Sequence, residues 1–384
     1  MRRLFFLVAL LALHMVTHAT IMKIGLFYGT SFQEATLTIA GGEYVLVLRD
    51  GKKQKAAEGD LLRVSASEHG CKLSLNKKEL GSFAKIRLVS EMGNGSIRFV
   101  LKLKEQAQFT YGGHFEIMSA GGKLKIINMV DLEPYVAAVV ESEAGDNASP
   151  EFLKVQSVLC RTYGLSHLDR HKGEGFQLCD QVHCQTYKGK SRFNKLAEEA
   201  AVATHNQVLV DASDNLIVAA YHSNCGGQTV PADSVWSSGL GYLQPVADTC
   251  CLAGYHSSWK MSVPLESWKR YLLKNGLITD QDTLADSLYA YVPAGRMATF
   301  SFNGKTFPLK TIRDDWKLKS TWFSISIAGD TAFFSGRGFG HGIGLCQEGA
   351  MQMAAGGKTF MEIINFYYRD VRLADADALE LLRK

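Results

Sequence analysis

A glutamate at the end of an apolar helix face is the clearest candidate for chemistry in this 384-residue chain. The segment Asp131–Ala144, DLEPYVAAVVESEA, offers an aspartate N-cap and a proline in the first turn, where proline removes no helix hydrogen bond. Its apolar residues and Glu143 recur with the helical period, whereas Glu141 is turned to another side. A carboxyl group on an apolar face is paired, protonated or in use. The pattern therefore singles out Glu143.

A second amphipathic helix is predicted directly after the first. Residues 149–150 are Ser-Pro, an N-cap followed by a favourable first helical residue. Farther along, Lys154, Ser157 and Arg161 recur at spacings of three and four and so share one face. If this face lines a cleft, it places two cations and a hydroxyl group beside Glu143. The alternative is the solvated face of an ordinary helix.

Four potential metal ligands lie close together after the second helix. The segment GFQLCDQVHCQTY contains Cys179, His183 and Cys184 within six residues, and His171 lies eight residues before the first of them. Histidine and cysteine are the usual ligands of tetrahedral zinc, so the spacing is compatible with a structural zinc site that anchors the loop. A Cys179–Cys184 disulfide, or unpaired thiols beside a surface histidine, fits the same residues.

A glycine-rich segment near the end of the chain surrounds one histidine. Residues 336–350, GRGFGHGIGLCQEGA, have glycine at every second position from 336 to 344, with His341 among them. The spacing matches no phosphate-binding loop. Glycine lets the main chain approach a ligand closely, and a helix starting near Leu345 would offer free N–H groups. The alternative is a tight turn with a hydrogen-bonded histidine.

The elements that position these residues indicate the α+β class. Short alternating strands bounded by turn residues fill residues 22–112. A hairpin over 113–130 leads into the helix that carries Glu143, and residues 252–335 mix strands with a helix. The last helix is opened by a capping box at 359–362, Thr-x-x-Glu.

The composition and the N-terminus predict an exported protein. The chain is 46% hydrophobic and 21% charged, and Arg2 and Arg3 contribute two units of its net charge of +4, which does not favour nucleic-acid binding. Residues 1–19 combine a basic start, an apolar run and a small-residue cleavage site, as in a signal peptide. The apolar run is short for a permanent anchor, so we expect a soluble protein of the periplasm or cell envelope without a stable membrane span.

In that compartment one or two disulfides are expected among eight cysteines, with Cys225 paired to Cys250 or Cys251 as the first possibility.

Five segments, in order, resemble the SpoIID/LytB family of bacterial cell-wall proteins. They are INMVDLEPYVAAVVESEA, SPEFLKVQSVLCRTYGL, LCDQVHCQTYKG, VAAYHSNCGGQT and GRGFGHGIGLCQEGAMQMAAGG…INFYY. The resemblance implies a SpoIID-like catalytic domain with a substrate groove over residues 113–372. The β-rich N-terminal region, 22–112, and a C-terminal tail, 373–384, lie outside it.

The resemblance also implies a peptidoglycan lytic transglycosylase. Such an enzyme cleaves MurNAc–GlcNAc strands, preferentially peptide-stripped ones, and leaves 1,6-anhydro-MurNAc ends. The family's VVPSEMP-like segment is VVESEAG here, so Glu143 becomes the general acid and base, although Glu141 and Ala144 replace proline and methionine. The alternatives are a non-catalytic glycan-binding enhancer of a cell-wall amidase and a structural wall protein.

The resemblance also implies a metal site, and the reaction it implies makes further residues candidates for binding sugars. The family's metal-holding Cys/His loop implies a structural zinc ion on His171, Cys179, His183 and Cys184. The family's GHGxGxSQxGA motif has Cys346 in place of serine here, and Glu348 in place of an aromatic residue. The candidates for binding sugars are Lys154, Arg161, Tyr163, Gln185, Tyr187, Ser223, His341 and Gln347.

Overall fold

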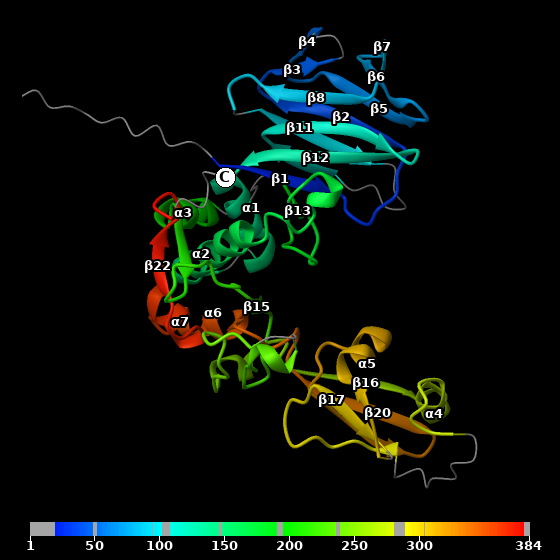
Figure 1. Ribbon diagram of the computed structural model, residues 1–384, viewed down its shortest axis with the longest axis vertical. Coiled ribbons are helices and arrows are strands. Elements are labelled where there is room, and N and C mark those ends of the chain that lie inside the picture. The colour runs from blue at the N-terminus through cyan, green and yellow to red at the C-terminus, as the bar shows by residue number, and fades with distance from the viewer. Residues whose placement is uncertain are drawn as a thin grey trace, which may run out of the picture.

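The computed structural model describes residues 20–48, 52–93, 95–101, 108–145, 148–189, 195–235, 239–279, 289–302 and 304–379. Figure 1 shows a β-sandwich at one end of the long axis, helices in the middle and a mixed lobe at the other end. Helices and strands are both abundant, in agreement with the predicted α+β class. The predicted signal peptide lies outside the described residues. Among those described, no helix is long and apolar enough to cross a membrane.

The N-terminal part is a sandwich of two sheets. Its strands are β1 (Ile21–Leu26), β2 (Glu34–Gly41), β3 (Tyr44–Val47), β4 (Lys53–Ala56), β5 (Leu61–Ser67), β6 (Gly70–Leu75), β7 (Lys78–Phe83), β8 (Lys85–Ser90), β9 (Ser96–Leu101), β10 (Gln108–Gly112), β11 (His114–Ala120), β12 (Lys123–Asp131) and β13 (Leu178–Cys179). The seven-stranded sheet has the order β13-β1-β12-β11-β8-β3-β4 and the six-stranded sheet the order β10-β9-β2-β5-β6-β7. The hairpin β11–β12, which the sequence grouped with the following domain, therefore completes the sandwich.

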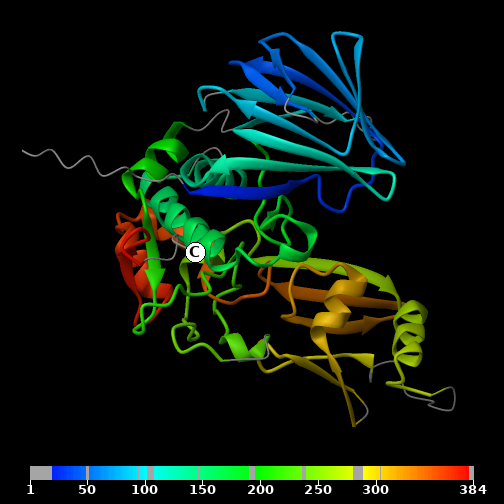
Figure 2. The same cartoon turned by 45° about the horizontal axis from the view of Figure 1, so that its top comes forward.

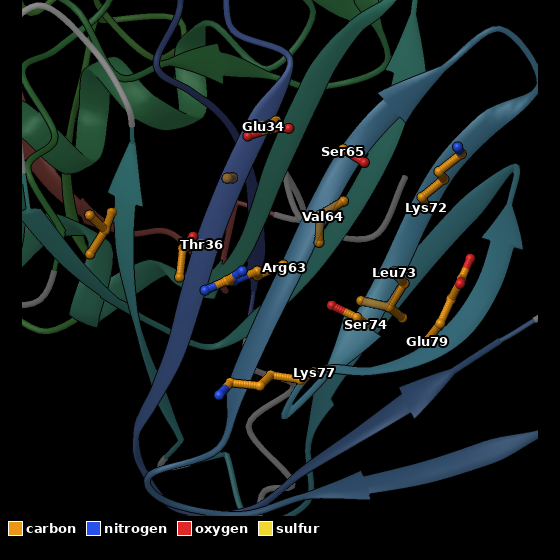
Figure 3. Close-up of a pocket in the computed structure, with 12 residues that line it drawn as sticks. Glu34, Thr36, Arg63, Val64, Ser65, Lys72, Leu73, Ser74, Lys77 and Glu79 are labelled. Carbon is orange, nitrogen blue, oxygen red and sulfur yellow. The ribbon is translucent and has the colours of Figure 1, made fainter.

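The alternation of side chains explains why these segments are strands. On β5 and β6, Leu62, Val64 and Leu73 are at most 2% exposed and face the second sheet, while the residues between them face outward. Arg63 and Lys77 lie with other polar residues around a shallow hollow of about 600 Å³ on the outer face (Figure 3). This hollow shares no lining residue with the groove described below.

The central part is built on helices that continue directly from the sandwich. Its elements are α1 (Leu132–Ala144), α2 (Pro150–Ser166), η2 (Lys172–Glu174), α3 (Lys195–Ala203), β14 (Gln207–Val210), β15 (Tyr221–His222), η3 (Ala232–Ser234), η4 (Cys250–Ala253), β21 (Leu345–Cys346), α6 (Gln347–Ala355), α7 (Phe360–Tyr367) and β22 (Arg372–Asp375). Strand β22 pairs with β14, so the predicted tail begins as a strand.

The predicted helix boundaries are present in the structure. Gly145 ends α1 with φ +73°, a conformation that suits glycine. Ser149 caps α2 by accepting a hydrogen bond from the N–H of Phe152 at 3.5 Å. At α7, the side chain of Thr359 accepts from the N–H of Glu362, whose carboxylate accepts from the N–H of Thr359, which confirms the capping box.

The mixed lobe between β15 and β21 has its own hydrophobic core. It consists of β16 (Ser258–Pro264), α4 (Leu265–Lys274), β17 (Thr299–Phe302), β18 (Lys305–Pro308), α5 (Leu309–Trp316), β19 (Phe323–Ala328) and β20 (Thr331–Arg337). Trp268, Phe300 and Phe334 are fully buried at its centre. The chain enters through β16 and leaves through the neighbouring β20, which is the arrangement of an inserted lobe. Figure 2 shows the orange chain running from this lobe back to the helices.

Candidate functional site

Glu143 lies in a groove between the helices and the glycine-rich segment. The groove has a volume of about 530 Å³. Of the residues considered from sequence, it is lined by Glu143, Tyr163, His183, Cys184, Ser223, His341 and Gln347. These residues come from α1, α2, the loop after α2, the residue that follows β15, the glycine-rich turn and the start of α6. Segments up to about two hundred residues apart in sequence thus meet at one carboxyl group.

The end of α1 holds the Glu143 carboxylate at the groove while keeping part of it available. The helix buries Val136, Val139 and Val140 completely against the core, so its orientation is fixed. Glu143 itself is half-buried. The N–H of Thr186 donates to its Oε1 at 2.9 Å, and within the described residues no basic side chain forms an ion pair with it. A carboxyl group anchored through one oxygen can exchange a proton through the other.

Several residues of the groove were not found from the sequence. Tyr221 and His222 form the two-residue strand β15, which pairs in parallel with β21 and so brings them to the groove. Arg170 also lines the groove and donates hydrogen bonds to the Tyr163 hydroxyl at 2.9 Å and towards His183. Both Tyr221 and His222 stand in the motif VAAYHSNCGGQT, but no spacing of apolar and polar residues in that motif marks them as groove residues.

The four predicted metal ligands converge at one edge of this groove. Their ligand atoms, from His171, Cys179, His183 and Cys184, all lie within 4.8 Å of one another. His171 Nδ1 is 2.6 Å from the Glu174 carboxylate, which leaves Nε2 directed to the cluster, 3.4 Å from Cys184 Sγ. A carboxylate that orients a histidine in this way is typical of zinc sites. The donor set and its outer support therefore fit a tetrahedral zinc ion.

The loop that carries the cluster is tied to the sandwich. Strand β13 pairs with β1, so Cys179 lies opposite Gly25. The buried Asp180 carboxylate accepts hydrogen bonds from the N–H groups of Phe27 and Tyr28. The loop that forms this wall of the groove is consequently anchored to the N-terminal sandwich.

Comparison with known proteins places these features in one family. A family model described as stage II sporulation protein, SpoIID, matches residues 120–210, which include α1, α2 and the Cys/His loop. Stage II sporulation protein D of Bacillus subtilis (strain 168) is 30% identical over 273 residues, 66% of this chain and 77% of that protein. The chain belongs to the SpoIID family.

Two other relatives support the same assignment. Stage II sporulation protein D of Bacillus amyloliquefaciens is 29% identical over 270 residues, 66% of this chain and 76% of that protein. The protein named amidase enhancer of Bacillus subtilis (strain 168) is 27% identical over 281 residues, 60% of this chain but 39% of the longer relative. The family resemblance read from five segments is therefore confirmed.

In this SpoIID-family chain Arg161 cannot bind a sugar, contrary to the prediction from the sequence. It is fully buried, and its guanidinium donates to both carboxylate oxygens of Glu133, at 2.8 and 2.5 Å. It also donates to the carbonyl oxygens of Ser157, Ala201 and Gln207. The predicted helix face is thus an internal face that joins α1, α2, α3 and β14.

Three other predicted sugar contacts also lie outside the groove lining. Lys154 forms an ion pair with Glu151 at 2.6 Å and lies over the Phe360 ring, against α7. Gln185 is 1% exposed and donates to the Tyr135 hydroxyl and the Cys160 carbonyl. Tyr187 is 2% exposed, and its hydroxyl donates to the Asn128 side chain, which joins the loop to the sandwich. The three side chains therefore make contacts within the fold and are not part of the groove surface.

His341 of the glycine-rich turn and His222 of β15 meet at the groove. The His341 ring lies 5.3 Å from the His222 ring, and its Nδ1 accepts the N–H of Ile343 at 3.0 Å. Burial, and then the nearby Arg296 cation, lower the pKa of His341 to about 4. Burial and the charge of His341 lower the pKa of His222 well below its usual range. Near neutral pH these rings supply no cation, and the ring acceptor without a hydrogen-bond partner in the described part of the chain is His222 Nε2.

The His341 shift predicts a stability loss in mild acid. The unfolded imidazole takes up a proton near pH 6.5, whereas the folded one does so at about 4. Between these values the unfolded state binds more protons, so the free energy of unfolding should fall as the pH is lowered. Urea unfolding at pH 7 and pH 4.5 should show a smaller fall for His341→Asn, which keeps an acceptor for Ile343. An equal fall in both proteins would contradict the prediction.

The carboxylate of the glycine-rich motif, Glu348, has a structural role. Glu348 accepts a hydrogen bond from Asn224 Nδ2 at 2.7 Å and is 2.5 Å from Nδ1 of His256. It fixes the segment before the inserted lobe and is not among the residues that line the groove.

Proposed function

We propose that the protein is a peptidoglycan lytic transglycosylase with Glu143 as its single general acid and base. Its substrates would be MurNAc–GlcNAc strands, preferentially those stripped of stem peptides. Such a role requires export to the periplasm or cell envelope, in line with the signal-like residues 1–19. The observation that carries the proposal is the placement of Glu143 in the groove. The residue is half-buried and has no cationic partner among the described residues.

The proposed reaction uses one carboxyl group twice. Protonated Glu143 first donates its proton to the glycosidic oxygen as the bond to the muramyl C1 breaks. The resulting carboxylate then takes the proton of the muramyl C6 hydroxyl, whose oxygen closes the 1,6-anhydro ring on C1. The glutamic acid is regenerated, and no water molecule enters the product. This is why one carboxyl group suffices where glycoside hydrolases use two.

The residues around Glu143 suit a sugar strand whose charge is confined to its lactyl carboxylates. Burial raises the pKa of Tyr221 well above its usual range, and nearby Cys160 and Glu143 act in the same direction, so its phenol stays protonated. The Tyr221 hydroxyl and His222 Nε2 can exchange hydrogen bonds with sugar hydroxyl and acetamide groups, whereas the His341 ring is held by the main chain at Tyr221 and Ile343. Tyr163, Ser223 and Gln347 add further polar groups to the lining, and Arg170 supplies a cation for the carboxylate of a muramyl lactyl group.

We further propose that His171, Cys179, His183 and Cys184 hold a structural zinc ion. His183 and Cys184 line the groove, so a metal on them would fix its wall. All four positions would be filled by protein ligands, which leaves none for a catalytic water. The metal content of Cys184→Ser, described below with that of a second cluster, tests this assignment.

The alternative function is that of a glycan-binding enhancer of a cell-wall amidase. The relative named amidase enhancer is the observation that favours it. In that case the same groove would hold a glycan strand without cleaving it, and the partner would be a separate amidase.

Product analysis distinguishes these functions. The purified protein should convert peptide-free glycan strands into fragments with anhydro-muramyl ends, detected by mass spectrometry. In ¹⁸O-labelled water a transglycosylase incorporates no label at the new end, whereas a hydrolase incorporates one atom. Binding without new ends, together with stimulation of an amidase, would support the enhancer and overturn the proposed enzyme.

A further inference from the structure

Four buried groups converge beside α6, apart from the His/Cys loop. Cys225 lies three residues after β15, and Cys346 is the N-cap of α6. Asp248 precedes the turn η4, and Cys251 lies within it. Their three sulfur atoms and a carboxylate oxygen all lie within 4.8 Å of one another. All four residues are fully buried. Three separate stretches of the chain therefore direct their ligand groups to one point in the interior.

The spacing of these groups suits a tetrahedral metal ion. Zinc–sulfur bonds of about 2.3 Å place two thiolates of a tetrahedral site about 3.8 Å apart. Here Cys225 Sγ lies 3.3 Å from Cys251 Sγ and 3.4 Å from a carboxylate oxygen of Asp248. We propose that Cys225, Asp248, Cys251 and Cys346 form a second, structural zinc site. Binding releases the three thiol protons to solvent, and the bound site carries a net charge of −2.

The main chain around the cluster favours negatively charged ligands. The N–H groups of Cys225 and Gly349 donate to Cys346 Sγ at 3.2 and 3.4 Å. The Asp248 carboxylate accepts from the Tyr367 hydroxyl at 2.9 Å and from the N–H of Cys250 at 3.0 Å. These donors orient the ligands. The Asp248 oxygen that faces Cys225 Sγ, Oδ2, is the one that accepts from Tyr367. A cluster of neutral thiols would need no such set of donors.

An unpaired cation beside the cluster provides a second, independent observation. The guanidinium of Arg296 is buried, and its three nitrogen atoms have no hydrogen-bond partner among the described residues. Burial lowers the pKa of Arg296 to about 10, and Cys225 and Cys346 are near enough to interact with its charge. The guanidinium lies over the Trp322 ring at 6.0 Å, but a buried cation without hydrogen bonds or an anionic partner is strongly unfavourable. The anionic metal–thiolate site would supply the missing negative charge.

The sequence predicted a disulfide from Cys225 to Cys250 or Cys251, and a Cys225–Cys251 bridge would account for fewer of these contacts than a metal ion. In the structure all eight cysteines are unbridged. A disulfide would engage two of the four groups and would leave the Asp248 carboxylate and the Cys346 thiol buried beside it. Zinc engages all four. Cys346 also stands where the family motif has serine, so the fourth ligand is a feature of this chain.

The second site would stabilise a different part of the groove from the first. Cys225 comes two residues after Ser223, and Cys346 directly precedes Gln347; both of these neighbours line the groove. Zinc at this point would hold β15 and the start of α6 together, independently of the Cys/His loop. The inference concerns metal content and does not depend on the proposed enzymatic activity.

Metal analysis of the purified protein tests the proposal. We expect two zinc ions per chain in the wild type, one in Cys346→Ser, one in Cys184→Ser and none in the double variant. Cys250→Ser is the matched control, because its exposed thiol lies beside Cys251 but outside the cluster, and it should keep two. A wild type with one zinc ion that Cys184→Ser abolishes would overturn the second site, and so would an unchanged zinc content in Cys346→Ser.

A measurement on the wild type covers the case in which Cys346→Ser does not fold. With zinc bound, native alkylation should label Cys250 and spare Cys225, Cys251 and Cys346. Removal of zinc by a chelator should make all three reactive, and added Zn²⁺ should protect them again. A peptide map that shows a Cys225–Cys251 disulfide, or thiols whose labelling is insensitive to the chelator, would contradict the proposal.

Discussion

Glu143→Gln should lower the rate at which anhydro-muramyl ends form by about 100- to 10,000-fold, the usual effect of removing a general acid. Glutamine has nearly the same shape, and its amide oxygen can still accept the N–H of Thr186, which donates to Glu143 Oε1 at 2.9 Å. The midpoint of thermal unfolding and the affinity for glycan strands should therefore change little. The rate is measured by mass spectrometry of the products, and the affinity by cosedimentation with insoluble peptidoglycan.

Glu141→Gln is the matched control for this prediction. It removes the same charge from the same helix, two residues earlier, at a residue that does not line the groove. Its rate should stay within a few-fold of the wild type. If the two variants lose activity equally, the effect comes from the charge of the helix end and Glu143 is not the acid.

The position of Glu143 could be predicted because the information is local. Within Leu132–Ala144 the apolar spacing, the cap position and the terminating glycine are read from adjacent residues, and the helix begins and ends where they indicate. The Cys/His cluster was predictable for the same reason, since its four members lie within a short stretch between His171 and Cys184. Short-range spacing therefore identified both the carboxyl group in the groove and one wall of the groove.

Residues that reach the groove through long-range pairing could not be predicted in this way. Tyr221 and His222 form a strand of two residues, too short to show alternation, and they depend on pairing with Leu345 and Cys346. The second metal-ligand cluster could not be predicted for the same reason. Cys225 and Cys346 become neighbours only when β15 pairs with β21, and Asp248 and Cys251 join them from a third segment. The chain order of such residues carries no signal of their proximity.

The face of α2 shows a different limit of sequence reasoning. Helical spacing correctly groups Lys154, Ser157 and Arg161, but it does not say whether that face meets solvent, ligand or another element. In the structure Ser157 and Arg161 are fully buried. Arginine at full burial is rare unless it is paired, and the partner, Glu133, lies on the preceding helix with no spacing rule that connects the two. Tertiary packing decided the role of this face.

Arg161→Met should therefore destabilise the protein by about 3 kcal/mol or more, without a specific effect on glycan binding. Methionine fills part of the space, but Glu133 keeps a carboxylate that is 20% exposed and loses both of its guanidinium hydrogen bonds. Three backbone carbonyl groups lose their donor as well. Because a native domain is stable by only about 5–15 kcal/mol, the midpoint of urea unfolding should shift clearly to lower concentration.

Lys154→Met on the same helix provides the comparison. Its ion pair with Glu151 is about one-third exposed, and such pairs contribute about 0–1 kcal/mol, so the unfolding midpoint should change little. Arg161→Lys should fall between the two methionine variants, because an ammonium group keeps the charge but cannot make the two-pronged contact with Glu133. If Arg161→Met instead keeps the wild-type midpoint and loses affinity for glycan strands, the guanidinium contacts substrate and the buried arrangement is wrong. An intermediate midpoint for Arg161→Lys with unchanged affinity would show that the geometry of the ion pair matters as well as its charge. This ion pair holds α1 against α2, and α1 carries Glu143 into the groove.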